Sequence, residues 1–441
     1  MKHILIIASL LFAIGLNGYA QQDTSKNQTY NFSVAECIVY AYQHQHDVKN
    51  ANLDVESAGY HVKEIIGQGY PQINVTASFT DYVKSPVIVL SPTTKFPIYQ
   101  PYNSSFGPNF TQIIFDPSYL VGLQGRKTYK QLYDRSYTRT KIETNVNVTK
   151  AYYQVLVSVE QLKLIEANIS ELKQQLDETV ARNKQGFVEK IDVQRLTVQY
   201  NSLITNRENT IRLLALNYEL LKFQMGMPIE KDLTLKDKLE DIQLDAGVAA
   251  AVNDTAVYRN RIEYGLLETQ NKLDQYDLKL KKGQFLPKLT ANGSYSPAYL
   301  STTIGSLYNT QYPSAFIGLN LTVPIFSGWQ HVNQYKESKI NLMKSQNDLS
   351  DMKNTINLQV EQARISYING LQTLNDQKKN MALAEEVLRV TKIKYEQGVG
   401  SSIEVTQAQT DVEQADNTYI QGLYDALVSK VDLDKAYGRI Q

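Results

Sequence analysis

The chain has 441 residues, and its 45 basic residues balance its 45 acidic residues. A neutral chain carries no basic footprint for nucleic acid, so we expect no nucleic-acid partner. Its single cysteine, Cys37, excludes an intramolecular disulfide and a cysteine-cluster metal site. The 30 tyrosines suit boundaries between apolar and wet surroundings, because each ring carries a polar tip.

The first residues have the pattern of an export signal. Lys2 and His3 precede an apolar run from Ile4 to Leu16, and a small residue, Ala20, lies before Gln21. This run is shorter than the roughly 20 residues that span a bilayer, and no later segment supplies one. We therefore predict that residues 1–20 are a signal peptide, and that the exported chain is periplasmic, secreted or a β-barrel.

An internal repeat divides the mature chain into two halves. The segment 184–188 matches 396–400 and Gly226 matches Gly438, each 212 residues apart, while the turn at Pro71 matches that at Pro287. A period of this size indicates duplication of a whole architectural half. The predicted domains are a first repeat, a linker and a second repeat, at 21–226, 227–246 and 247–441.

Each half contains a segment of strand-like alternation. In the first half apolar side chains recur at every second residue from Ile73, with Asn74, Thr76 and Ser78 between them. Such alternation predicts β-hairpins at about 71–116 and 287–326, each with one apolar and one polar face. We expect the apolar face to contact lipid through Ile73, Val75, Ala77, Phe79, Leu289, Ala291, Ala315, Ile317, Leu319 and Leu321.

Very long helices follow each hairpin. The stretch from Arg126 to Gln185 contains no Gly or Pro, and only Gly370 interrupts the stretch from Trp329 to Gln397. A helix over the first stretch would extend roughly 90 Å, and a heptad pattern from Leu162 to Leu176 indicates coiled-coil packing. Each half also begins with a helix, and its hairpin leads into antiparallel helices predicted at about 118–185 and 189–225, and at about 329–397 and 401–437.

Four strands cannot close a membrane barrel, because single-chain barrels begin at eight strands and open edges are not tolerated in lipid. We therefore expect a homotrimer that completes a 12-stranded barrel, continued by an α-barrel of the long helices. The fold class is mostly α with a membrane β-barrel portion. The alternative is a soluble periplasmic coiled-coil adaptor or scaffold, which would not depend on detergent.

At these residues the chain resembles the TolC-type outer-membrane efflux family over nearly its whole mature length. The match rests on Phe32 to Cys37, Tyr70 to Ile73, Val323 to Gly328 and the paired glycine turns at Gly186 and Gly398. The resemblance implies an exit duct in the Gram-negative outer membrane with a periplasmic helical extension. It also implies a periplasmic adaptor protein, an inner-membrane pump and outer-membrane lipid as partners.

The resemblance further implies where the duct is contacted and closed. The adaptor contacts would be the turn residues Gly186, Phe187, Val188, Gly398, Val399 and Gly400. The periplasmic gate would contain Asp192, Tyr395, Glu404 and Gln407. Gly400 stands where the family's best-known members have an Arg, so one lock of the gate is absent here. Asp411 is a possible further pore acid, although a solvated helix charge is the favoured interpretation.

A search for chemistry yields no enzyme site. His44 and His46 are two residues apart in a predicted helix and so point to different faces, which is a poor metal pair. Gly67-Gln68-Gly69 lies just before Pro71 and is typical of a turn from helix to strand. We expect no catalytic residues, no metal and no cofactor.

Overall fold

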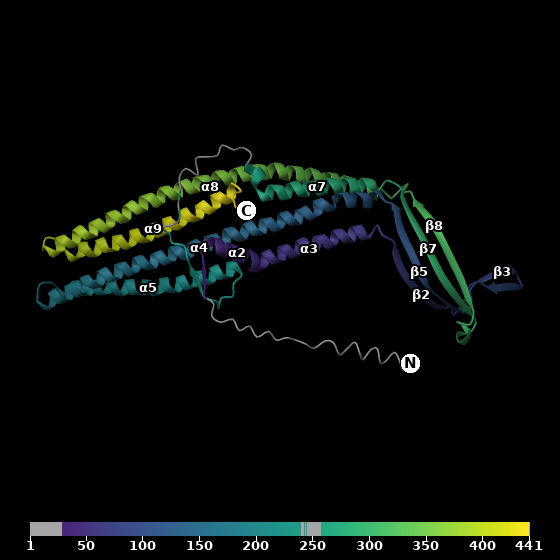
Figure 1. The fold of residues 1–441 in the computed structure, drawn as a ribbon, viewed down its shortest axis with the longest axis horizontal. Coiled ribbons are helices and arrows are strands. Elements are labelled where there is room, and N and C mark those ends of the chain that lie inside the picture. Colours follow the sequence, from purple (N-terminus) through teal and green to yellow (C-terminus); the bar gives the residue numbers. More distant parts are fainter. Residues whose placement is uncertain (1–28, 240–241, 243, 245–256, 441) are drawn as a thin grey trace.

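The structure is a computed structural model, and it describes residues 29–239, 242, 244 and 257–440. Figure 1 shows an elongated molecule with long helices at one end and a sheet at the other. The elements of the first half are β1 (Tyr30–Phe32), α2 (Val34–His44), α3 (His46–Gly67), β2 (Gln72–Asp81), β3 (Val87–Ser91), β4 (Thr94–Pro97), β5 (Tyr102–Phe115), α4 (Pro117–Lys184) and α5 (Lys190–Met225).

The second half repeats this order with fewer short elements. After β6 (Leu233–Leu235) come η2 (Val257–Asn260), α7 (Ile262–Gly283), β7 (Lys288–Ser301), η3 (Ile304–Ser306), β8 (Gln311–Thr322), α8 (Gln330–Glu396) and α9 (Ser402–Ala436). The predicted fold class, long helices with a smaller strand portion, is confirmed. The predicted signal peptide, residues 240–241, 243 and 245–246 of the predicted linker, and residues 247–256 of the predicted second repeat lie outside the described residues.

Local sequence explains where the longest helix begins. The Asp116 carboxylate accepts hydrogen bonds from the backbone amides of Ser118 at 2.8 Å and Tyr119 at 3.3 Å, which caps α4. Pro117 occupies the first turn, where its missing N–H costs nothing. The 68 residues of α4 extend about 100 Å at the usual rise per residue. Together, α4 and α5 form one antiparallel hairpin, and α8 and α9 form the other.

The four long strands form one antiparallel sheet in the order β2-β5-β7-β8. Strand β5 runs through Gly107 and Pro108, and its pairing with β2 continues there. Its pairing with β7 is interrupted over 106–108. A Cβ on Gly107 would lie 1.9 Å from the backbone oxygen of Tyr295, so the glycine permits the close approach of β5 and β7. Tight packing on the neighbouring strand therefore explains why this position carries no side chain.

The segments 84–103 and 297–312, between the long strands of each hairpin, are themselves partly strands. A separate two-stranded hairpin of β3 and β4 projects beyond the sheet in Figure 1. Strand β7 also continues to Ser301, and β8 begins at Gln311. Val87 to Leu90 are all apolar, so this strand lacks the alternation that the long strands show in the sequence.

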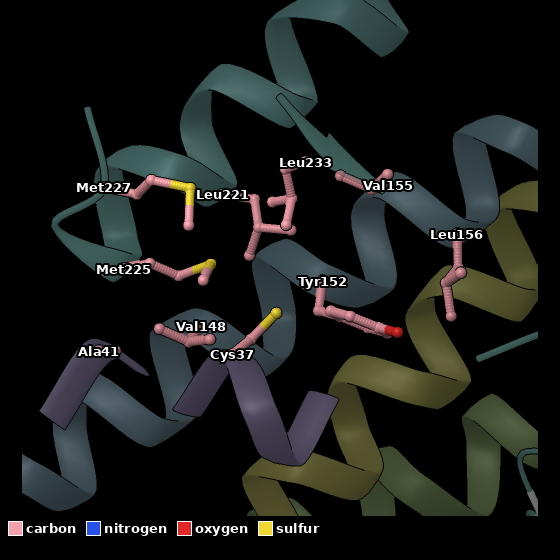
Figure 2. Packing of buried hydrophobic residues seen from close by; sticks show 10 residues of the cluster. All are labelled: Cys37, Ala41, Val148, Tyr152, Val155, Leu156, Leu221, Met225, Met227 and Leu233. Carbon is pink, nitrogen blue, oxygen red and sulfur yellow. The ribbon is translucent and has the colours of Figure 1, made fainter. Parts of the chain in front are cut away.

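The main buried cluster ties the short helix α2 to the first helical hairpin. Figure 2 shows Cys37 and Ala41 of α2 packed with Val148 and Tyr152 of α4, and with Leu221 from α5. Burial raises the pKa of the Cys37 thiol to about 12, so the thiol is inert at neutral pH. A parallel pairing of β1 with β6 closes this end of the cluster, and the Tyr152 hydroxyl donates to Asp237 at 2.9 Å.

Candidate functional site

The turn between α4 and α5 is built around a left-handed glycine. Gly186 has φ of +80°, a conformation that a side chain disfavours. The backbone amide of Phe187 donates to the carbonyl of Arg182 at 3.0 Å, and that of Gly186 donates to Asn183 at 3.0 Å. This pair of hydrogen bonds is a Schellman cap, which ends α4 and lets the chain reverse.

The turn between α8 and α9 has the same construction 212 residues later. Gly398 has φ of +75°, and its amide donates to the carbonyl of Tyr395 at 3.0 Å. The amide of Val399 donates to the carbonyl of Lys394, also at 3.0 Å. Both turns lie at the end of the molecule farthest from the sheet (Figure 1), so the predicted adaptor contacts lie on two neighbouring turns of one tip.

The side chains of the tip are apolar yet unburied within the chain. Phe187 is 77% exposed and Val399, at the equivalent position of the second turn, is 79% exposed. Val188 is half-buried, and its carbonyl accepts a hydrogen bond from the Asn183 side chain at 2.7 Å. The fold of both turns is thus held by backbone and amide groups, which leaves Phe187 and Val399 available to a partner.

The structure places the predicted gate residues Asp192 and Tyr395 in one neighbourhood. The Ser402 hydroxyl at the start of α9 donates a hydrogen bond to the Asp192 carboxylate, a link between the two hairpins that sequence reasoning missed. The Tyr395 hydroxyl is buried, and no described residue accepts or donates a hydrogen bond to it. Burial raises the pKa of Tyr395, with Asp192 adding to the increase and Arg182 opposing it, so the phenol stays neutral.

The other two gate residues lie on the exposed face of α9. Glu404, Gln407 and Asp411 are exposed, whereas Val405 and Ala408 are buried against α8. The Gln407 amide donates to the Asp411 carboxylate at 2.9 Å. The three polar side chains thus form a stripe on the face of α9 that points away from the core of the hairpin.

Several further links join the hairpins at positions that the sequence analysis did not single out. The ammonium of Lys150 lies 2.6 Å from a carboxylate oxygen of Asp432, and Lys392 pairs with Glu171. Between these two pairs along α4, the side-chain amide of Asn168 donates to Asp416 at 2.7 Å. Such pairs join residues more than 200 positions apart, and no short sequence pattern indicates them.

The apolar face predicted for the strands is continuous across the sheet. Direct register partners share a face, and Ile73 pairs with Phe110, Phe110 with Gly293, and Gly293 with Ile317. All ten residues predicted to face lipid therefore lie on this face, and β5 adds Phe106, Pro108 and Phe110, which the sequence analysis did not include.

The opposite face of the sheet is polar and uncharged over most of its width. The Ser78 and Ser105 hydroxyls are 2.8 Å apart, and the Asn109 amide donates to the Thr76 hydroxyl at 2.7 Å. One face is thus fitted to hydrocarbon and the other to water. The outer strands β2 and β8 each have one edge to which no described strand pairs.

In the described part of the chain, no helix combines the length and the hydropathy that a bilayer span requires. The sheet carries a broad apolar surface on one face, and its opposite face is polar and suited to contact with water. Together with the helical hairpins of about 100 Å, the two faces of the sheet define a class of protein: an outer-membrane channel protein with a periplasmic helical extension.

Comparison with known proteins identifies the family. The family described as "Outer membrane efflux protein" matches residues 38–210 and 267–439, one match in each repeat. The chain therefore belongs to the outer membrane efflux protein family. It is 23% identical to the outer membrane protein TolC of Vibrio cholerae, over 76% of this chain and 77% of that protein. It is 22% identical to TolC of Escherichia coli, over 100% of this chain and 87% of that protein.

Solved structures have the same fold. The channel CusC superposes with a TM-score of 0.76 at 16% identity, over 94% of this chain and 95% of that chain. VceC from Vibrio cholerae superposes with a TM-score of 0.75 at 12% identity, over 92% and 96% of the two chains. The protein is thus an outer-membrane exit duct of a tripartite efflux or secretion system, which works with adaptor and pump partners, and it is not an enzyme.

Proposed function

We propose that three copies of the chain assemble into one duct with a 12-stranded barrel in the outer membrane and a helical barrel in the periplasm. The observation that carries this proposal is the pair of open strand edges on β2 and β8, beside a continuous apolar face. Unpaired strand edges cost several kcal/mol per backbone group in lipid, so the edges must be covered. Pairing β8 of one protomer with β2 of the next covers both edges.

The helices support the same ring through the internal repeat. Within one chain α4 packs against α9, and the repeat makes α8 the equivalent of α4, and α5 the equivalent of α9. The equivalent contact of α8 with α5 does not form within the chain, and both helices retain exposed apolar residues. On α5 they include Leu213, Leu216, Leu220 and Phe223, and on α8 they include Leu358, Ile365 and Ile368. Packing α8 of one protomer on α5 of the next buries both sets.

At the tip we propose that the adaptor protein binds the two glycine turns of each protomer. The support is the equal exposure of Phe187 and Val399 on turns whose backbone is already capped. The contact set comprises Gly186, Phe187, Val188, Gly398, Val399 and Gly400. Two apolar side chains per protomer, repeated around a ring, offer a set of anchors for a partner with matching pockets.

The same end of the duct contains the proposed gate. The hydrogen bond of Ser402 to Asp192 links the two hairpins beside the tip, and the buried Tyr395 lies next to this link. Glu404 and Gln407 on the exposed stripe of α9 face the pore in this arrangement. A ring of three Glu404 carboxylates favours cations over anions.

Conductance of the purified, detergent-extracted protein in planar bilayers tests this function. We expect discrete channels with cation selectivity, and Glu404→Gln should reduce the selectivity without removing the channels. Lys379→Gln, at an exposed site on α8, is the matched control and should leave selectivity unchanged. Absence of discrete channels from a folded preparation would overturn the duct.

Adaptor binding is measured separately with Phe187→Asp and Val399→Asp. Each variant should lose binding to a co-expressed adaptor protein while it keeps wild-type conductance. Normal binding by the double variant would overturn the proposed contact.

A further inference from the structure

The two helical hairpins share an apolar core over only part of their length. About midway along α4, Val157 packs with Ile420, Leu423 and Leu427 of α9, so this cluster joins the hairpins. Toward the tip the described clusters separate. One contains Leu172 of α4 with Leu196 and Leu203 of α5, and the other contains Leu388 of α8 with Val405, Ala408 and Val412 of α9.

A polar layer marks the level at which the shared core ends. The Asn168 amide of α4 donates to one carboxylate oxygen of Asp416 on α9 at 2.7 Å. Asp416 is only 7% exposed, and its other oxygen has no hydrogen-bond partner among the described residues. Gln409, two turns closer to the tip on α9, is 1% exposed, and neither polar atom of its side chain has a partner there.

The surroundings of Asp416 disfavour its ionised form. Glu413 on α9 and Glu385 on α8 are the nearby carboxyls. The pocket beside Asp416 is lined by α4, α5 and α9, and the residues that line it include no lysine or arginine. The residues of α4 and α5 that line this pocket are all uncharged, among them Gln161, Asn206 and Asn209.

Burial raises the pKa of Asp416, the Asn168 amide opposes this, and Glu385 adds to the increase. Burial also raises the pKa of Glu413, the Gln199 side chain opposes this, and Asp416 adds to the increase. A buried carboxylate with one hydrogen bond and no cation is costly, whereas the neutral acid is not.

We propose that Asn168 and Asp416 form a proton-controlled clasp between the two hairpins, which holds the tip closed when Asp416 is neutral and releases it when Asp416 is ionised. This inference rests on the proposed duct, because the clasp acts on the opening of its tip. Beyond the clasp the described links between the hairpins are polar, namely Glu171 with Lys392 and Asp192 with Ser402. Polar links near the surface stabilise the contact between the hairpins less than a buried apolar core does.

The sign of the pH dependence follows from the raised pKa. The closed arrangement binds the proton more tightly than the parted one, in which water reaches the carboxyl. Closure is therefore favoured at low pH, and it weakens as the pH rises from the ordinary aspartate value through the raised pKa of the closed state. The opening equilibrium of each clasp should shift by up to about tenfold per pH unit in that window, since one proton leaves each clasp, and the open probability should rise with it.

Single-channel recordings as a function of pH test the clasp. Asp416→Asn preserves the shape and the acceptor of the hydrogen bond but cannot ionise, so we expect a closed channel without this pH dependence. Asp376→Asn is the matched control, because Asp376 is exposed on α8 and its neighbour Gln377 contacts Thr418 of α9, half a turn from Asp416. The control should retain the wild-type pH dependence. Wild-type pH dependence in Asp416→Asn would overturn the proposal.

A disulfide assay tests the clasp without reference to conduction. Asp192→Cys and Ser402→Cys join positions in contact, and the only native cysteine, Cys37, is buried. We expect the pair to cross-link faster at low pH than at high pH after correction for thiol reactivity with a small thiol reagent, and Asp416→Asn should remove the difference. A pair that cross-links equally at all pH values, with wild-type Asp416 in place, would overturn the clasp. If the protein forms no channels but its cross-linking still depends on pH, only the proposed duct would be contradicted.

Discussion

The helices α4 and α8 occupy equivalent places in the two repeats, yet they bury different amounts of apolar surface. Val146 of α4 is 4% exposed, whereas its equivalent Leu358 on α8 is 59% exposed. Leu156 and Ile368 are a second such pair, one buried and one exposed. The first helix is covered from within the chain by α2, α5 and α9. The second packs on α9 and α7 but keeps exposed apolar positions of the repeat, and in the proposed ring another copy covers them.

The helix ends, in contrast, are alike in both repeats. The glycines at 186, 226, 398 and 438 all have positive φ, and each is followed by the same pattern of backbone hydrogen bonds. Turn chemistry depends on a few neighbouring residues, so duplication preserves it. Burial depends on which elements lie alongside, and here the two halves have diverged.

The largest expected effect comes from a charge placed on the covered helix. Val146→Asp should unfold the protomer or lower its free energy of unfolding by at least about 3 kcal/mol, because the carboxylate is buried without a partner. Thermal unfolding followed by circular dichroism in detergent measures this. A stable, helical Val146→Asp protein would contradict the burial of α4.

The matched change on α8 sharpens the comparison. Leu358→Asp should leave the protomer helical but prevent the trimer, because the charge lies in the proposed contact with α5 of the next copy. Native mass spectrometry reports assembly, and circular dichroism reports folding. Asn354→Asp, at an exposed site one turn earlier, is the control and should assemble normally. A Leu358→Asp trimer would place the uncovered face of α8 outside the interface.

The two faces of the sheet also differ, because one is apolar and the other is polar. Leu319→Arg on the apolar face of β8 should destabilise the membrane-inserted form by about 2–4 kcal/mol if the residue lies near the bilayer midplane. Asn320→Arg, on the opposite face of the same strand, should be tolerated. Urea unfolding in lipid vesicles measures both. Equal effects of the two changes would mean that the faces are not separated by lipid and water.

The smallest effects are expected at the tip, where the halves should behave alike. Gly186→Ala and Gly398→Ala should each cost about 1–2 kcal/mol, because a Cβ disfavours the left-handed conformation. Gly305→Ala is the control, since its added Cβ meets no atom within 4 Å and its φ is not positive. Denaturant midpoints measure the changes. A cost at only one of the two turns would show that their equivalence is superficial.

Much of the fold could be predicted from the sequence because its signals are local or periodic. Long stretches without Gly or Pro, the alternation from Ile73 and the glycine turns are patterns of this kind. The repeat doubled each signal and so strengthened it. The same patterns predicted which residues form the apolar face of the sheet and which residues form the tip.

What the sequence could not show depends on contacts between distant elements. The pairing of β1 with β6 joins three-residue strands that are too short to have a period. The helix break at Gln45 has no Gly or Pro to mark it, although its side chain caps the next helix. Asn168 and Asp416 are ordinary polar residues on long helices, and only the packing of α4 on α9 makes them a buried pair.

The account depends most on the claim that other copies cover the open strand edges and the exposed face of α8. The mass of the detergent-extracted outer-membrane particle tests this claim directly by native mass spectrometry. We predict a single species with three times the mass of one mature protomer. A stable monomer in that fraction would leave the four strands with open edges in lipid, and it would contradict the account.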